Sequence, residues 1–157
     1  MAVVAEELYS LLVPLGEDRL IVPRSCIAEV VRYAATPVEG QHAPWIYGIT
    51  QWGGQDIPII SFETMCGQKA PEPSGRTRVV VFHPLGVVEG CPPYGLLSEG
   101  FPQMVKLNRE VVVLDESYHV PDDAPLVCQI VMIKDHALIP DLEIVEQNIA
   151  AELGVSA

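Results

Sequence analysis

The amino-acid sequence predicts an all-β protein of two lobes, with one short helix near its C-terminal end. Short runs rich in Val and Ile recur along the chain, each bounded by Gly, Pro or charged residues, which is typical of sandwiches and barrels. Hydrophobic residues make up 49% of the sequence, enough to offset the entropy of ordering the chain. A length of 157 residues suits one compact domain or two small lobes with a shared interface.

Charge and cysteine usage narrow the possible partners and compartment. The chain has 9 basic and 21 acidic residues, and a net charge of −12 repels nucleic acid and anionic membrane surfaces. No apolar run approaches the ~18 residues of a spanning helix, and Met1–Leu12 lacks the basic region of a targeting segment. The four cysteines form no CxxC pair. We therefore expect a cytoplasmic protein with reduced thiols, no nucleic-acid partner and no direct membrane insertion.

The first elements are a hairpin and a single strand. Leu8–Leu15 and Leu20–Val22 flank a charged turn, so they are expected to pair. Pro23 then interrupts the ladder, and Cys26–Tyr33 follows as a strand. Period-two alternation in that strand favours Ile27, Val31 and Tyr33 on one face, although the alternation is incomplete.

The clearest hairpin comes next. Trp45–Trp52 and Asp56–Phe62 flank the turn Gly53-Gly54-Gln55, whose two glycines supply the positive φ of a tight turn. Residues 69–76 then combine Pro, Gly, Ser and charge without apolar periodicity, which predicts an exposed linker near the middle of the chain.

The second half repeats the strand-rich pattern. Strands are expected at Arg78–His83, Tyr94–Ser98, Phe101–Leu107, Val111–Leu114, Val127–Ile133 and Ala137–Pro140. Apolar residues at helical spacing predict a helix over Glu143–Leu153, ended by Gly154. Residues 59–63 resemble residues 139–143 in their apolar and acidic positions, at an offset of 80, which suggests duplicated β lobes.

The sequence lacks the local motifs of common enzyme and cofactor sites. A zinc site assembled from Cys91, His119 and Cys128 is conceivable, but buried thiols and a loop histidine fit these spacings better. Cys91 precedes two prolines in a predicted loop, so it is the most exposable thiol and a remote candidate nucleophile. Neither a metal nor a cofactor is expected.

The hairpin segment 45–63, WIYGITQWGGQDIPIISFE, resembles the most diagnostic stretch of CheW-like domains. In that family a strand and an Arg-Gly turn lead into an apolar-Pro-apolar strand. Tyr94–Phe101 is similar to a later family segment, and Leu138–Leu142 resembles the closing strand. The resemblance runs in order from about Leu8 to about Ile149, which makes it stronger than any single motif.

The resemblance implies a single CheW-like domain over residues 1–157, built from two intertwined five-stranded SH3-like barrels. The expected lobes are 20–68 with the C-terminal segment, and 76–140, which exchange terminal strands across the linker 69–76. The implied function is that of a non-enzymatic adaptor. Such a protein couples the cytoplasmic tip of a methyl-accepting chemoreceptor to the regulatory domain of a CheA-type histidine kinase.

Seven residues are candidate protein-binding positions. By the match to the family, the positions that contact receptor or kinase are Ile27, Glu29, Val31 and Gly48. The other three form the hairpin turn: Trp52, Gly53 and Gly54. Core packing is an equally good interpretation of the two aliphatic residues, and the glutamate could be only a solvated strand residue. Gly53 replaces the turn arginine of the family, so partner contacts should differ, and the Gly-Gly turn is more similar to adaptors of pilus-linked systems.

Two other functions remain open on the sequence. A stand-alone β-barrel ligand-binding module should show a deep apolar pocket with a few polar groups. A divergent enzyme should show perturbed titratable groups gathered in a cleft. An adaptor should instead show an exposed apolar groove between its lobes, too shallow for a small molecule.

Overall fold

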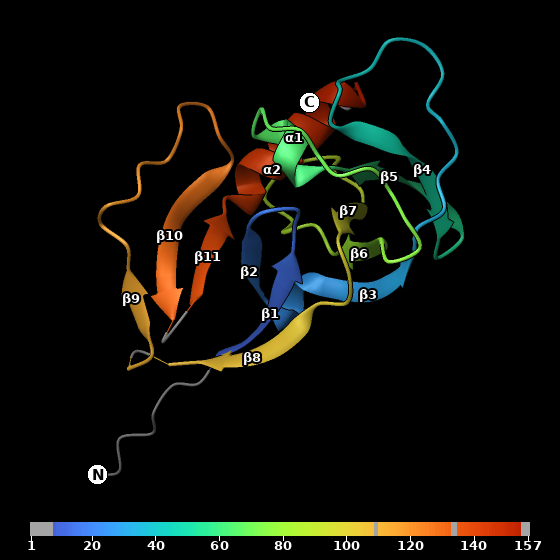
Figure 1. The fold of residues 1–157 in the computed structure, drawn as a ribbon. Coiled ribbons are helices and arrows are strands. Elements are labelled where there is room, and N and C mark those ends of the chain that lie inside the picture. The colour runs from blue at the N-terminus through green and yellow to red at the C-terminus, as the bar shows by residue number, and fades with distance from the viewer. Residues whose placement is uncertain (1–7, 109, 133–134, 155–157) are drawn as a thin grey trace.

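The structure, a computed structural model, describes residues 8–108, 110–132 and 135–154, and these form two curled β-sheets (Figure 1). The six-stranded sheet has the order β8-β1-β2-β11-β10-β9. Its strands are β1 (Leu8–Pro14), β2 (Arg19–Pro23), β8 (Gln103–Leu107), β9 (Val112–Leu114), β10 (Leu126–Met132) and β11 (Asp135–Pro140). The five-stranded sheet has the order β3-β6-β7-β5-β4. Its strands are β3 (Ile27–Arg32), β4 (Ile46–Trp52), β5 (Gln55–Ile60), β6 (Arg78–Phe82) and β7 (Tyr94–Ser98).

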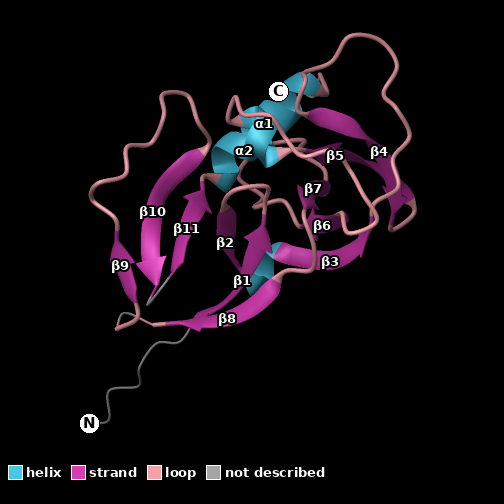
Figure 2. Ribbon diagram, viewed as in Figure 1, coloured by secondary structure: helices cyan, strands magenta, loops and turns pink. Residues whose placement is uncertain are grey.

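Helix is a minor component, as Figure 2 shows. The helices are the 3-10 turn η1 (Arg24–Cys26), α1 (Phe62–Met65) and α2 (Leu142–Glu152). The predicted fold class is therefore confirmed, with a sixth strand in one of the two sheets. The predicted turn at residues 134–136 lies partly outside the described residues.

The assignment of strands to the two sheets differs from the predicted division into the lobes 20–68 and 76–140. Strands β6 and β7 belong to the sheet that also holds β3, β4 and β5, because β7 pairs in parallel with β5 and antiparallel with β6. Strands β1 and β2 join the C-terminal strands through a parallel pairing of Leu20 with Leu138. The segment 69–76 consequently connects two strands of one sheet rather than two lobes.

Three apolar cores explain why the strands lack clean alternation. One core fills the five-stranded sheet, a second fills the six-stranded sheet, and a joint core lies between the sheets against α1 and α2. Within β6, Val79 and Val81 face the first core, while Val80 and Phe82 face the joint core. Both faces of the central strands are buried, so their sequences read as continuous apolar runs.

Strand β3 corrects the predicted face assignment. Its register with β6 shifts between Ile27 and Glu29, and such a bulge reverses the faces of the residues that follow. Ile27 consequently packs against the joint core, whereas Val31 and Tyr33 pack inside the five-stranded sheet. The prediction that Ile27 and Val31 share a face is wrong for this reason.

The segments that echo each other at an offset of 80 residues fold alike. Ser61 follows β5, and its side chain accepts a hydrogen bond of 3.2 Å from the Thr64 N–H at the start of α1. Asp141 follows β11 and accepts one of 3.2 Å from the Ile144 N–H at the start of α2. Both residues are N-caps, which stabilise the first turn of a helix. The echo therefore records a repeated strand, cap and helix unit.

A buried carboxylate fixes α2 to the five-stranded sheet. Glu146 is 0% exposed and accepts hydrogen bonds from the Leu85 N–H, at 2.9 and 3.1 Å, and from the Tyr94 hydroxyl at 3.0 Å. Tyr94 also stacks on Phe82 with ring centroids 5.3 Å apart. Burial raises the pKa of Glu146, the two hydrogen bonds act against that rise, and Glu143 adds to it.

Candidate protein-binding surface

Glu29 and Trp52 come from the two edge strands of the five-stranded sheet. The Trp52 indole N–H donates a hydrogen bond of 2.7 Å to a carboxylate oxygen of exposed Glu29, across 23 residues of sequence. The sheet curls so that its two edge strands approach each other. Thr36, just beyond β3, forms two backbone hydrogen bonds of 2.8 Å with Ile49 of β4. A hydrogen bond to a charged acceptor fixes the indole more firmly than a neutral one would.

The turn beside Trp52 is open to solvent. Gly53 and Gly54 have φ of 58° and 79°, and Trp52 pairs directly with Gln55, so the turn has two residues rather than the predicted three. A Cβ added at either glycine would meet nothing within 4 Å. We call Glu29, Trp52, Gly53 and Gly54 the hairpin surface. Four of the seven predicted positions meet there.

Gly48 has a structural role of its own. Its φ is +150°, and a Cβ there would lie 2.8 Å from the Thr36 carbonyl oxygen and 2.9 Å from the Ala35 Cβ. Gly48 is also buried and sits at a register shift between β4 and β5. The glycine therefore lets the chain after β3 approach β4 closely enough to close the barrel.

Ile27 and Val31 lie in different surroundings. Val31 packs inside the five-stranded sheet beside the buried residues of that core. Ile27 lines a groove between the two sheets, which has a volume of about 620 Å³. We call this the interlobe groove, and its lining residues are Leu8, Tyr9, Leu11, Arg24, Ser25, Ile27 and Ala28.

The interlobe groove lies where β1 of one sheet passes β3 of the other (Figure 1). Leu8 is 52% exposed and Tyr9 is 47% exposed, so apolar surface faces solvent there. The sequence alone did not single out Tyr9 or Arg24, because only the crossing of the two sheets places them beside Ile27. Apolar surface of this kind is typical of protein-binding sites.

Two buried carboxylates with a raised pKa lie in different parts of the described structure. The buried carboxylates are separate: Glu63 on α1 accepts a 3.0 Å hydrogen bond from the Gly16 N–H, while Glu146 on α2 binds the loop after β6. Burial raises the pKa of Glu63, the bond from Gly16 acts against that rise, and Glu99 and Asp18 add to it. Glu63 also lines an open surface hollow of about 740 Å³ together with Asp18 and Glu72.

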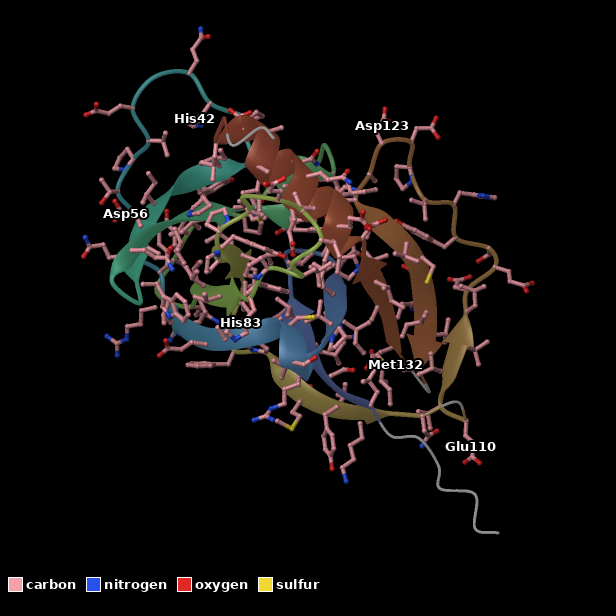
Figure 3. All side chains as sticks on the ribbon, turned by 180° about the vertical axis from the view of Figure 1, so that it is seen from behind. His42, Asp56, His83, Glu110, Asp123 and Met132 are labelled. Carbon is pink, nitrogen blue, oxygen red and sulfur yellow. The ribbon has the colours of Figure 1, made fainter. Side chains whose placement is uncertain are left out.

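The conceivable zinc ligands are also dispersed. Cys91 packs against the joint core, whereas Cys128 packs against the core of the six-stranded sheet. Within the ranges that the structure describes, no three His, Cys, Asp or Glu residues are placed to hold a metal ion. Figure 3 likewise shows His42, His83 and Asp123 in separate parts of the molecule.

The cysteines are expected to react slowly. Burial and then nearby Glu146 raise the pKa of Cys91 to about 12, and burial with Asp18 and Glu63 raises that of Cys66 to about 11. At pH 8 the thiolate fraction of Cys91 should fall about three orders of magnitude below that of a free cysteine. Iodoacetamide labelling followed by mass spectrometry should show this, with the urea-unfolded chain as the control. Equal rates in folded and unfolded chains would contradict it.

Two curled sheets around a joint core, with an open groove between them, define a double-barrel β protein whose exposed features suit protein contacts. Residues 10–143 match the family model of the CheW-like domain, which spans most of the sequence. The chain therefore belongs to the CheW-like domain family. The resemblance of the sequence to CheW-like domains is confirmed.

A solved structure agrees in fold. The scaffolding protein TtCheW from Thermoanaerobacter tengcongensis superposes with a TM-score of 0.72 at 17% sequence identity, over 90% of this chain and 89% of that one. No curated protein matches the sequence closely enough to count as a relative. Among the described residues, no helix is long and apolar enough to cross a membrane.

Proposed function

We propose that this protein is a cytoplasmic, non-enzymatic adaptor that couples the tip of a methyl-accepting chemoreceptor to the regulatory domain of a CheA-type histidine kinase. The observation that carries the proposal is the hairpin surface, where half-buried Trp52 and exposed Glu29, from opposite edges of a barrel, are joined by a 2.7 Å hydrogen bond. Family membership supports the chemosensory role. Both partners would bind to one protein of 157 residues.

An adaptor needs two separate docking surfaces on one stable body. The hairpin surface and the interlobe groove supply two such surfaces on adjoining parts of the molecule: the first joins the β4–β5 turn to Glu29 of β3, and the second lies between β1 and the start of β3. The joint core packs both sheets together, which holds the two surfaces at a fixed spacing. We propose that one partner docks on each surface. Ile27 belongs to the groove, and Gly48 and Val31 support the barrel that carries the hairpin surface.

Glu29→Lys is expected to weaken binding to one of the two partners at least tenfold while leaving the fold intact. The substitution reverses an exposed charge and removes the acceptor of the Trp52 N–H. The measurement is capture of the purified kinase regulatory domain and of a receptor tip peptide from the same organism. Glu116→Lys is the control, because it makes the same charge change at an exposed loop residue near the other sheet.

The outcomes separate the site from the function. Binding of both partners by wild type, with no loss in Glu29→Lys, would contradict the assignment of the hairpin surface. Failure of wild type to bind either partner would contradict the adaptor function itself. Equal loss in Glu29→Lys and Glu116→Lys would mean that net charge, rather than this surface, governs binding.

A further inference from the structure

Two arginines oppose each other on neighbouring strands without a compensating carboxylate. Arg32 of β3 and Arg78 of β6 are direct cross-strand partners, so their side chains leave the same face of the sheet. Like charges placed directly opposite each other destabilise a sheet. Arg32 is exposed and Arg78 is half-buried.

The absence of a carboxylate is unexpected in so acidic a chain. The sequence has 21 acidic residues, and the described residues include an ion pair of 2.6 Å between Arg19 and Asp135. Within the same described part of the chain, neither Arg32 nor Arg78 forms an ion pair. The two positive charges therefore remain uncompensated, although the fold could have placed an acidic residue beside them.

The Arg78 side chain is already held in place. One terminal nitrogen donates to the carbonyl oxygens of Gly75, at 2.9 Å, and Thr77, at 3.0 Å. The guanidinium carbon lies 4.9 Å from the centroid of the Phe101 ring, which is itself 68% exposed. The Nε atom of Arg78 is buried without an acceptor. A planar cation fixed in this way loses little entropy on binding a ligand.

We propose that Arg32, Arg78 and Phe101 form a binding site for an Asp or Glu side chain of a partner protein. A carboxylate between the two guanidinium groups would compensate both charges, and planar guanidinium matches carboxylate geometry. The Phe101 ring offers the flanking residues of the partner an apolar contact. A protein segment fits better than a nucleic acid, because a chain of net charge −12 repels a long polyanion more strongly than a short acidic peptide, and the exposed Phe101 ring suits contact with side chains. This site is separate in composition from the hairpin surface and the interlobe groove.

The site can be tested without a known partner. The probe is acetyl-hexaglutamate amide, added to the full chain while the arginine Nε–Hε resonances are followed by NMR, with acetyl-hexaglutamine amide as the neutral reference. We expect saturable shifts at Arg32 and Arg78 with the acidic peptide only. Arg32→Gln should weaken binding at least tenfold, and Lys69→Gln, which removes an exposed cation of the segment 69–76, should not change it.

Each other outcome overturns the proposal. Equal binding by wild type and Arg32→Gln would place the peptide elsewhere, and tighter binding of inorganic phosphate than of the peptide would make this a phosphate site. Arg78→Gln removes the hydrogen bonds to Gly75 and Thr77 and so can perturb folding. Arg32→Gln removes no contact of this kind, so it carries the test.

A charge reversal provides a second readout. Arg32→Glu places a carboxylate opposite Arg78, so it should raise the melting temperature by roughly 1–2 °C while abolishing binding of hexaglutamate. A stability gain combined with loss of binding is expected of a site kept uncompensated for a partner. A lower melting temperature, or retained binding, would contradict the proposal.

Discussion

Replacing Glu146 with alanine is expected to lower the free energy of unfolding by about 3–5 kcal/mol. The variant leaves the Leu85 N–H and the Tyr94 hydroxyl without their acceptor and creates a cavity in a fully buried position. Urea unfolding should show a lower midpoint with an unchanged slope. A loss below about 0.5 kcal/mol, typical of surface substitutions, would contradict this role for Glu146.

Glu146→Gln is the matched control, because glutamine keeps the acceptor oxygen and removes the charge. It should cost much less stability than Glu146→Ala.

The raised pKa of Glu146 also makes the free energy of unfolding depend on pH. The folded state binds the proton more tightly than the unfolded state, so the stabilisation is complete below the ordinary glutamate pKa and is lost as pH rises through the raised value. The glutamine variant should lose this part of the pH dependence, and an unchanged profile would contradict the assignment.

Gly48→Ala is expected to destabilise the protein by about 2–4 kcal/mol. The new methyl group would approach the backbone oxygen of Thr36, which cannot rotate away, and the φ of +150° disfavours any side chain. Gly53→Ala is the control, since it also has positive φ but open space around it, and should cost only about 1–2 kcal/mol. Equal losses in the two variants would contradict a steric role for Gly48.

The same variant should open the barrel locally. The backbone amides of Thr36 and Ile49 each donate a 2.8 Å hydrogen bond to the other residue. Their hydrogen–deuterium exchange should accelerate more in Gly48→Ala than in Gly53→Ala. Any loss of partner binding in Gly48→Ala would then follow from displacement of the hairpin surface. Substitutions at Gly48 are for this reason poor evidence of direct contact with a partner.

Local features of the fold could be predicted from the sequence. The Gly53-Gly54 turn and the strands around it follow from turn chemistry, and the final helix shows clear helical spacing. Strand-to-sheet assignment could not be predicted in the same way. It depends on parallel pairings such as Leu20 with Leu138 and Ile59 with Gly95, which no local pattern indicates.

The candidate sites divide along similar lines. Family resemblance pointed to Glu29 and placed Trp52 in the hairpin turn, but their hydrogen bond arises from curling of the sheet, which brings distant strand edges together. The bulge after Ile27 was hidden because both faces of β3 are apolar. The sequence does not indicate the pair Arg32 and Arg78, since the two residues become neighbours only through the register of β3 with β6.

The pairing of N-terminal with C-terminal strands in one sheet affects how the chain can fold during its synthesis. Strand β2 pairs with β11, so the sheet that contains Leu20 cannot be completed until Leu138 has been synthesised. Residues up to Pro140 must therefore leave the ribosome before the six-stranded sheet is complete, whereas the strands of the five-stranded sheet end at Ser98. Such non-local pairing slows folding. All strands of the five-stranded sheet are therefore synthesised before β10 and β11, which the N-terminal hairpin needs to complete its own sheet.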